Sequence, residues 1–206
     1  WMPDQPEHGM KGANVATNVY HALGSYKRFP SLVSYSNNNI VKNAKGAGSF
    51  RDNSNAVFNF VATRTNLYQL ASGVFTSRKA SLTGDADDFW TFTQFGEYVI
   101  ASNGVDQPQF YLMGTSTNFA NLNSIQTAGT TPLFRMSGVV RDFLVTGNIS
   151  TATNRIHWSG INDISAWSGK QSDFQDLPGS GGKIVHVTSG EIGYVFRQNQ
   201  IIRMDY

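Results

Sequence analysis

Residues 90–101 read WTFTQFGEYVIA and are the clearest indication of the secondary structure of this chain. Its first half is rich in aromatic residues and threonine, which favour β-strands. Gly96 and Glu97 follow as a turn, and residues 98–101 are then apolar almost throughout. A short apolar run without alternation is typical of a strand that is buried on both faces. The stretch therefore predicts a β-hairpin whose second strand lies inside a sheet.

The same texture recurs in residues 56–76, 136–159 and 183–204, where short runs of Val, Ile, Phe, Tyr and Thr alternate with Gly, Asn and Ser turns. The most apolar runs begin at residues 67, 98, 143 and 194, spacings of 31, 45 and 51. These spacings straddle the roughly 40–50 residues of one β-propeller blade. One meander buries too little alone, so neighbouring meanders must stack. We predict an all-β fold, a partial β-propeller of antiparallel meander blades, with a β-sandwich as the alternative.

The first fifty residues differ from the rest. They carry scattered Pro and Gly without a steady period, and we expect residues 1–50 to form an extended segment that packs on the propeller. Residues 37–39 and 45–48 are predicted loops, and residues 51–206 the N-terminal blades. One helical turn is predicted at residues 162–167. The chain opens on Trp1 without an apolar leader, so we expect a fragment whose remaining blades lie outside it.

Composition excludes several functional classes. The 206 residues are 40% hydrophobic, 13% aromatic and only 15% charged, which argues for a packed core and against disorder. A net charge of +2 lacks the basic excess of proteins that grip many phosphates. The absence of cysteine excludes disulfides, thiolate metal sites and a cysteine nucleophile. No apolar run reaches the roughly 20 residues that span a bilayer.

The titratable clusters do not form a recognisable site. Residues 85–88 (DADD) lack the glycine that a calcium loop needs at its sixth position, where Trp90 stands, so we interpret them as an acidic loop. The four histidines are scattered; we expect His186 to be buried and hydrogen-bonded, and His8, His21 and His157 to lie at the surface. We therefore predict no enzyme, no catalytic residues, no metal and no cofactor.

Two further patterns have a structural interpretation beside a functional one. Residues 179–183 (GSGGK) resemble a phosphate loop, but Ile184 and a strand follow where that motif needs Ser or Thr and a helix, which favours a linker between blades. A set of aromatic residues is compatible with sugar stacking or with core packing between blades. These residues are Phe89, Trp90, Phe92, Phe95, Trp158 and Trp167.

Three segments carry a resemblance to a known family. They are the early Gly-Tyr-Phe-Pro segment at residues 24–32 (GSYKRFPSL), the tryptophan-rich stretch 155–178, and the strand pair within 182–202. Together they resemble the packaged-DNA stabilisation proteins, also called tail accessory or tail nozzle proteins, of short-tailed bacteriophages. Ser31 stands where that family has Gly after the proline.

The resemblance implies a structural virion protein. Members of that family are β-propellers in a ring, commonly a hexamer, below the portal and its adaptor, where they close the DNA exit channel and retain the genome. The implied partners are copies of the chain, the head-to-tail adaptor and distal tail proteins, and double-stranded DNA passes through the lumen without sequence-specific binding. The implied location is the virion tail, assembled in the bacterial cytoplasm. The alternative is a carbohydrate-binding or receptor-interaction propeller.

Overall fold

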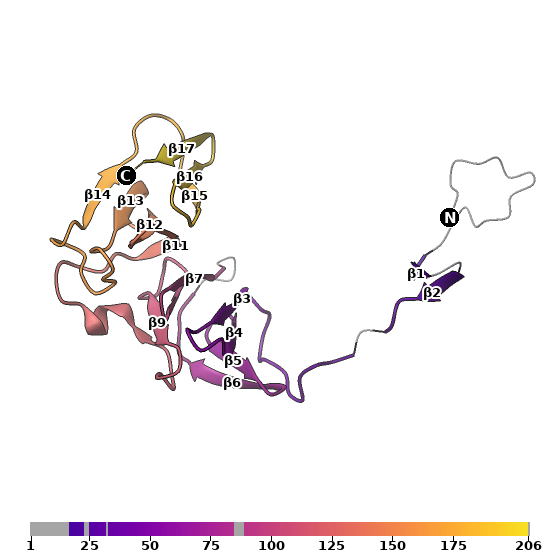
Figure 1. Ribbon diagram of the computed structural model, residues 1–206. Helices are drawn as coiled ribbons and strands as arrows, with labels where there is room; N and C mark the ends of the chain where they lie inside the picture. Colours follow the sequence, from indigo (N-terminus) through magenta and orange to yellow (C-terminus); the bar gives the residue numbers. More distant parts are fainter. Residues whose placement is uncertain (1–16, 23–24, 32, 85–88, 206) are drawn as a thin grey trace, which may run out of the picture. The chain divides into compact units, whose positions relative to one another are not determined.

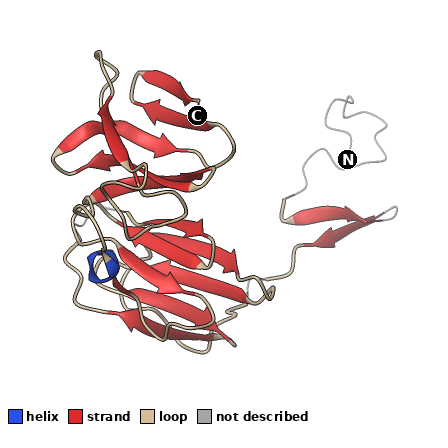
Figure 2. Ribbon diagram, turned by 60° about the vertical axis from the view of Figure 1, so that its left-hand side comes forward, coloured by secondary structure: helices blue, strands red, loops and turns tan. Residues whose placement is uncertain are grey.

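The computed structural model describes residues 17–22, 25–31, 33–84 and 89–205, and its strands are all paired antiparallel (Figures 1 and 2). The chain forms two compact units, Trp1–Tyr35 and Ser36–Tyr206. The one helix within the described ranges is a short 3-10 turn, η1 (Leu122–Ile125). The all-β prediction is confirmed. No helix in these ranges is long and apolar enough to cross a membrane.

The first unit contains a two-stranded hairpin. Strand β1 (Val19–Ala22) pairs with β2 (Ser25–Arg28), with Tyr20 opposite Lys27. The Phe29 N–H donates to the Asn18 carbonyl at 2.9 Å, and the rings of Phe29 and Tyr20 meet edge to face at 5.5 Å. That residues 1–50 pack on the propeller stays a prediction.

The second unit is a series of four antiparallel sheets, each built from strands that follow one another in the chain. The first sheet comprises β3 (Gly46–Arg51), β4 (Val57–Ala62), β5 (Leu67–Ala71) and β6 (Val74–Lys79). The second comprises β7 (Thr91–Phe95), β8 (Tyr98–Ser102), β9 (Gln109–Leu112) and β10 (Ala120–Asn121). The third comprises β11 (Phe134–Val140), β12 (Phe143–Ile149), β13 (Ala152–Trp158) and β14 (Asp173–Asp176). The fourth comprises β15 (Ile184–Val187), β16 (Gly193–Arg197) and β17 (Gln200–Met204).

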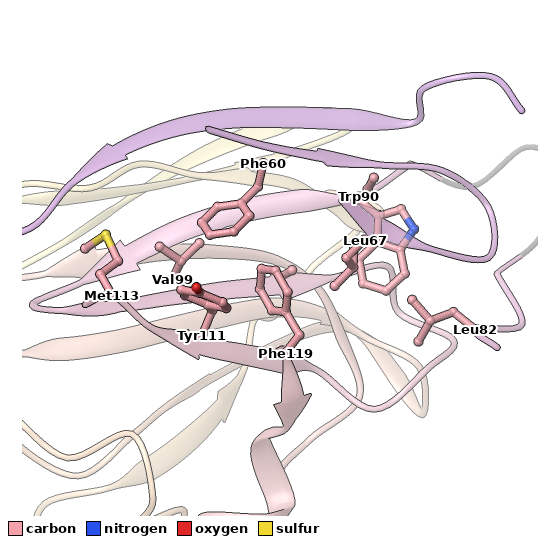
Figure 3. Packing of buried hydrophobic residues seen from close by; sticks show 10 residues of the cluster. Phe60, Leu67, Leu82, Trp90, Val99, Tyr111, Met113 and Phe119 are labelled. Carbon is pink, nitrogen blue, oxygen red and sulfur yellow. The ribbon is translucent and has the colours of Figure 1, made fainter. Parts of the chain in front are cut away.

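Each sheet packs its face on the next. Phe60, Trp90, Tyr111 and Phe119 belong to the buried cluster between the first and second sheets (Figure 3). A second cluster around Phe134 lies between the second and third sheets, and a third around Val145 lies between the third and fourth. Because successive meanders stack face to face in chain order, the unit is an open series of propeller blades.

The first strands of neighbouring sheets lie side by side, β3 beside β7, β7 beside β11 and β11 beside β15. Side chains fasten the central pair. The Thr91 hydroxyl donates to the Arg135 carbonyl at 2.7 Å, and the Thr93 hydroxyl donates to the Ser137 carbonyl at 3.1 Å. The two threonines of the 90–101 stretch therefore join one blade to the next.

The predicted loop at residues 45–48 is wrong at residues 46–48, because β3 begins at Gly46. Its glycines mark a close approach of two strands and not a turn. A Cβ atom at Gly46 would lie 2.4 Å from the Trp90 carbonyl oxygen, and one at Gly48 would lie 3.3 Å from the Phe92 Cβ. Glycine lets the first strand of this sheet lie against the second sheet.

The predicted helical turn at residues 162–167 is also wrong. The segment forms non-helical turns, in which Asp163 accepts hydrogen bonds from the backbone N–H of Ser165 at 2.9 Å and from its hydroxyl at 2.5 Å. An aspartate that bonds the backbone two residues ahead stabilises a turn as readily as a helix start. The side chains of Ile164 and Trp167, both within this segment, are buried.

Candidate functional site

His157 and His186 take positions opposite to those predicted. His157 on β13 is half-buried; its Nε2 lies 3.2 Å from the Trp167 carbonyl oxygen, and its ring contacts those of Trp167 and Phe174. Burial lowers the pKa of His157, although the Trp167 carbonyl opposes this. His186 is exposed, because the bulge between Ile184 and His186 interrupts the alternation of β15. His8 and the side chain of His21 lie outside the described residues.

Within the described ranges, no three His, Asp or Glu side chains gather as metal ligands would. The acidic run at 85–88 lies outside those ranges. The best-formed ion pair joins Arg155 and Asp176 across β13 and β14, with two N–O distances of 2.7 Å. The Arg155 hydrogen bond lowers the pKa of Asp176, and the guanidinium also lies 4.1 Å from the centre of the Phe174 ring. This pair fastens the outer strand of the third sheet.

The glycine-rich segment 179–183 connects the third and fourth sheets. Its carbonyl groups turn toward Arg197, whose guanidinium donates to the oxygens of Pro178 at 2.7 Å, Gly182 at 2.9 Å and Gly179 at 3.3 Å. Arg197 is only 5% exposed. A phosphate loop directs N–H groups at its ligand, whereas this loop directs carbonyl oxygens at a cation. The segment is a structural connection, and Arg197 was not singled out from the sequence.

The aromatic residues divide into core and surface. Trp90, Phe95 and Trp167 are buried, and Phe92 packs against the first cluster. Phe89 is 44% exposed. Trp158 is partly exposed on β13, and its Nε1 donates to the Gln171 carbonyl at 2.8 Å. Core packing therefore accounts for most of this set, and Trp158 alone of its tryptophans reaches an open surface.

The fourth sheet leaves one face uncovered. Val195 points into the core beneath the third sheet, so strand alternation places Tyr194 and Phe196 on the opposite face. Ile201 pairs with Phe196 and lies on that face, and it is 62% exposed, with Tyr194 at 40%. In the described part of the chain no other sheet packs on this face, so the burial of residues 194–196 on both faces stays a prediction. Exposed apolar sheet faces of this kind mark interaction sites.

A groove of about 460 Å³ opens between the third sheet and β17. Trp158 and Ile156 of β13 line one side, and Ile202 and Met204 of β17 line the other. The remaining lining residues are Val140, Phe143, Val145, Gln175, Leu177, Pro178, Gln200, Arg203 and Asp205. The groove is largely apolar and lies on the side of the fourth sheet opposite to Tyr194 and Ile201. We refer to the groove and the exposed face as the candidate interaction surface.

Sequence comparisons do not place the chain in a family. No family model matches it. No curated protein matches it either.

Structure comparisons show the fold alone. The designed protein Ika4 superposes with a TM-score of 0.53 at 10% identity, over 85% of this chain and 98% of Ika4. A chain of a mitotic checkpoint complex superposes with a TM-score of 0.51 at 14% identity, over 89% of this chain and 57% of that one.

Proposed function

We propose that this chain is a non-enzymatic structural protein of a short-tailed bacteriophage tail. In this role it assembles into a ring, or nozzle, below the portal and adaptor, closes the DNA exit channel and retains the packaged genome. The observation that carries the proposal is the apolar face of the fourth sheet on which Tyr194 and Ile201 are exposed in the described part of the chain. An exposed apolar sheet face of this kind is suited to association with further protein.

The segments that carry the family resemblance support the proposal through their structural roles. Trp167 is 3% exposed and packs between the second and third sheets, and residues 184–202 form most of the fourth sheet. The resemblance therefore concerns positions that build the blades. The described residues of the early segment, 25–31, lie in the first unit, where residues 25–28 form strand β2 of the hairpin.

The proposed partners follow from the same assignment. Copies of the chain form the ring, the head-to-tail adaptor and distal tail proteins bind its two ends, and DNA passes through the lumen. A net charge of +2 suits a channel along which DNA slides without a fixed register. The proposed location is the virion tail, after assembly in the host cytoplasm.

The decisive experiment is native mass determination of the purified chain combined with electron microscopy of virions labelled by an antibody against it. The proposal expects a multimer of defined copy number and label at the tail vertex. A monomer at all concentrations together with unlabelled virions would overturn it.

A carbohydrate-binding propeller is the second candidate, and the partly exposed Trp158 in an apolar groove favours it. Glycan-array binding that is lost in Trp158→Ala, by a chain that stays monomeric, would select this candidate. Trp90 is 4% exposed, so Trp90→Phe is the matched control and should leave glycan binding unchanged.

A further inference from the structure

The net charge of +2 averages parts of the chain that differ in sign. Residues 8–51, which we call the basic segment, contain six basic side chains and no Asp or Glu. The six are Lys11, Lys27, Arg28, Lys42, Lys45 and Arg51. Asp4 and Glu7 precede the segment, and residues 52–206 contain ten basic and twelve acidic side chains. A basic segment next to a slightly acidic body is typical of proteins that bind a polyanion through the segment.

The β1–β2 hairpin displays part of the basic segment beside aromatic rings. Tyr20 pairs directly with Lys27, so their side chains point to the same face of the two-stranded sheet. Phe29 joins them there, because its ring meets the Tyr20 ring edge to face at 5.5 Å. Tyr20 is 44% exposed and Phe29 is 61% exposed. This face therefore presents an ammonium group next to two accessible rings.

An open hollow of about 630 Å³ lies beside these side chains. Two of its lining residues are the neighbouring cations Lys27 and Arg28. The others are Tyr20, Pro30, Ser31 and Val33, and none of the lining residues is acidic. In the described part of the chain, neither cation has a carboxylate within ion-pair distance. A ligand with negative charges would supply the missing counter-charge.

The second unit has few free carboxylates to offer the basic segment. Four of its described acidic side chains are ion-paired with cations of the same unit. These pairs are Asp163 with Lys170, Asp176 with Arg155, Glu191 with Arg141, and Asp205 with Arg203. Asp52, Glu97 and Asp106 accept hydrogen bonds from backbone N–H groups. A polyanion from outside the chain therefore matches the segment better than the body does.

We propose that the basic segment binds single-stranded nucleic acid, with Lys27 and Arg28 on phosphate groups and Tyr20 and Phe29 against bases. A single strand alternates flat bases with charged phosphates, and proteins that hold it without sequence preference combine a basic surface with exposed aromatic rings. A two-stranded hairpin is marginally stable by itself in water, so a ligand that spans it would also stabilise it. The inference goes beyond the tail assignment and is independent of it, because its ligand is unpaired nucleotides and not a packaged duplex.

The probe is fluorescein-labelled oligothymidylate of about 20 nucleotides, and the control ligand is a duplex of the same length. Fluorescence anisotropy with the full chain should show saturable binding that weakens as salt is added. Binding should be at least tenfold tighter than that of the duplex, whose stacked bases offer no free ring faces. Equal or tighter binding of the duplex would overturn the proposal. Binding to vesicles that contain anionic lipid, without binding to the oligonucleotide, would overturn it as well and assign the segment to a membrane surface.

Two double variants of equal net charge locate the phosphate contacts. Lys27→Gln with Arg28→Gln changes the hairpin, and Lys183→Gln with Arg203→Gln changes exposed positions of the second unit. The hairpin variant should bind oligothymidylate at least tenfold more weakly at low salt. Its slope of log K against log salt should become shallower by about 1.4, which is about 0.7 for each phosphate contact on a single strand. The second-unit variant should keep the parent slope and bind within about twofold, and equal losses in the two variants would overturn the proposal.

Phe29→Leu separates base stacking from charge. The variant keeps an apolar side chain and both cations, so binding should weaken by about tenfold while the salt slope stays that of the parent chain. Phe174→Leu is the matched control, the same change at a ring that is 49% exposed in the second unit, and should bind within about twofold of the parent. Parent affinity in Phe29→Leu would remove the role of the rings and overturn the assignment to a single strand.

Discussion

The interface between the first and second sheets is closed at its outer end, whereas the interface between the third and fourth sheets is open. In the closed one, Phe119 fills the core and its N–H donates to the Arg78 carbonyl on β6 at 2.9 Å. Lys79 of β6 reaches the Asn121 side chain of β10 at 3.2 Å. In the open one, Trp158 and Met204 line a groove. In both interfaces the first strands of the two sheets lie side by side, but the described part of the fourth sheet contains no strand that corresponds to β10. The contacts of Phe119 and Asn121 show what such a strand adds between the first two sheets.

We expect the largest loss of stability when Phe119 is removed from the interface between the first and second sheets. Phe119→Ala removes a buried ring that contacts the rings of Phe60 and Tyr111 at 5.0 and 5.2 Å. We expect the free energy of unfolding to fall by about 3–5 kcal/mol in urea titrations. Met204→Ala, on the open side, should cost only about 1 kcal/mol because that side chain is partly exposed. Equal losses would show that the two interfaces are packed alike.

The second prediction concerns Arg197, which holds the 179–183 loop against the fourth sheet. Arg197→Met keeps an aliphatic side chain but leaves the carbonyl oxygens of Pro178, Gly179 and Gly182 without their donor. We expect a loss of about 2–3 kcal/mol in unfolding free energy by thermal or urea denaturation. Arg203→Met is the matched control on the exposed strand β17 and should change it by less than about 0.5 kcal/mol. An unchanged Arg197→Met would mean that the connecting loop does not stabilise the sheet.

The third prediction uses glycine-to-alanine substitutions to test whether the sheets approach each other equally closely at the first strands of the two interfaces. A Cβ at Gly46 would lie 2.4 Å from the Trp90 carbonyl oxygen, and one at Gly138 would lie 2.8 Å from the carbonyl oxygens of Val187 and Thr188. Gly46→Ala and Gly138→Ala should each lower the unfolding free energy by about 1–2 kcal/mol, measured in urea.

Ser49→Ala on the exposed side of β3 is the control for both glycine variants and should be neutral within about 0.5 kcal/mol. If Gly46→Ala lowers the unfolding free energy strongly and Gly138→Ala does not, the third and fourth sheets are packed less closely than the first and second at their first strands as well.

The same glycines explain why the sequence predicted the fold but misplaced its first blade. Gly46 and Gly48 have the composition of a loop, but both lie in a strand. Trp90 of the next sheet approaches Gly46, and the ring of Phe50 on the same strand, with Phe92 of the next sheet, approaches Gly48. The apolar run at residue 67 is the third strand of its sheet, β5, whereas the runs at residues 98, 143 and 194 are second strands. The spacing between residues 67 and 98 therefore does not measure one blade. First strands actually begin at residues 46, 91, 134 and 184, spacings of 45, 43 and 50. Local patterns predicted the hairpins, whereas their alignment depended on contacts between sheets.

The candidate interaction surface was less predictable than the fold. An apolar strand such as residues 194–196 reads the same whether a neighbouring sheet covers it or not, so its exposure has no local signature. Trp158 and Trp167 are equally prominent in the sequence, yet one lies beside a groove and the other is 3% exposed. Arg197 acquires its three carbonyl partners only when the 179–183 loop folds over it.

The smallest expected change in stability concerns two histidines, His157 on the third sheet and His186 on the fourth. Burial lowers the pKa of His157 in the folded chain below its ordinary value of 6.5. The unfolded chain therefore takes up a proton first as the pH falls through 6.5, and the free energy of unfolding decreases until the folded His157 is protonated as well. His157→Gln removes this pH-dependent decrease, so urea titrations at pH 7 and pH 5 should differ less in the variant than in the parent chain. His186 is exposed on the fourth sheet, and His186→Gln should change the free energy of unfolding at pH 7 by less than about 0.5 kcal/mol. A decrease between pH 7 and pH 5 that is as large in His157→Gln as in the parent chain would overturn the prediction for His157.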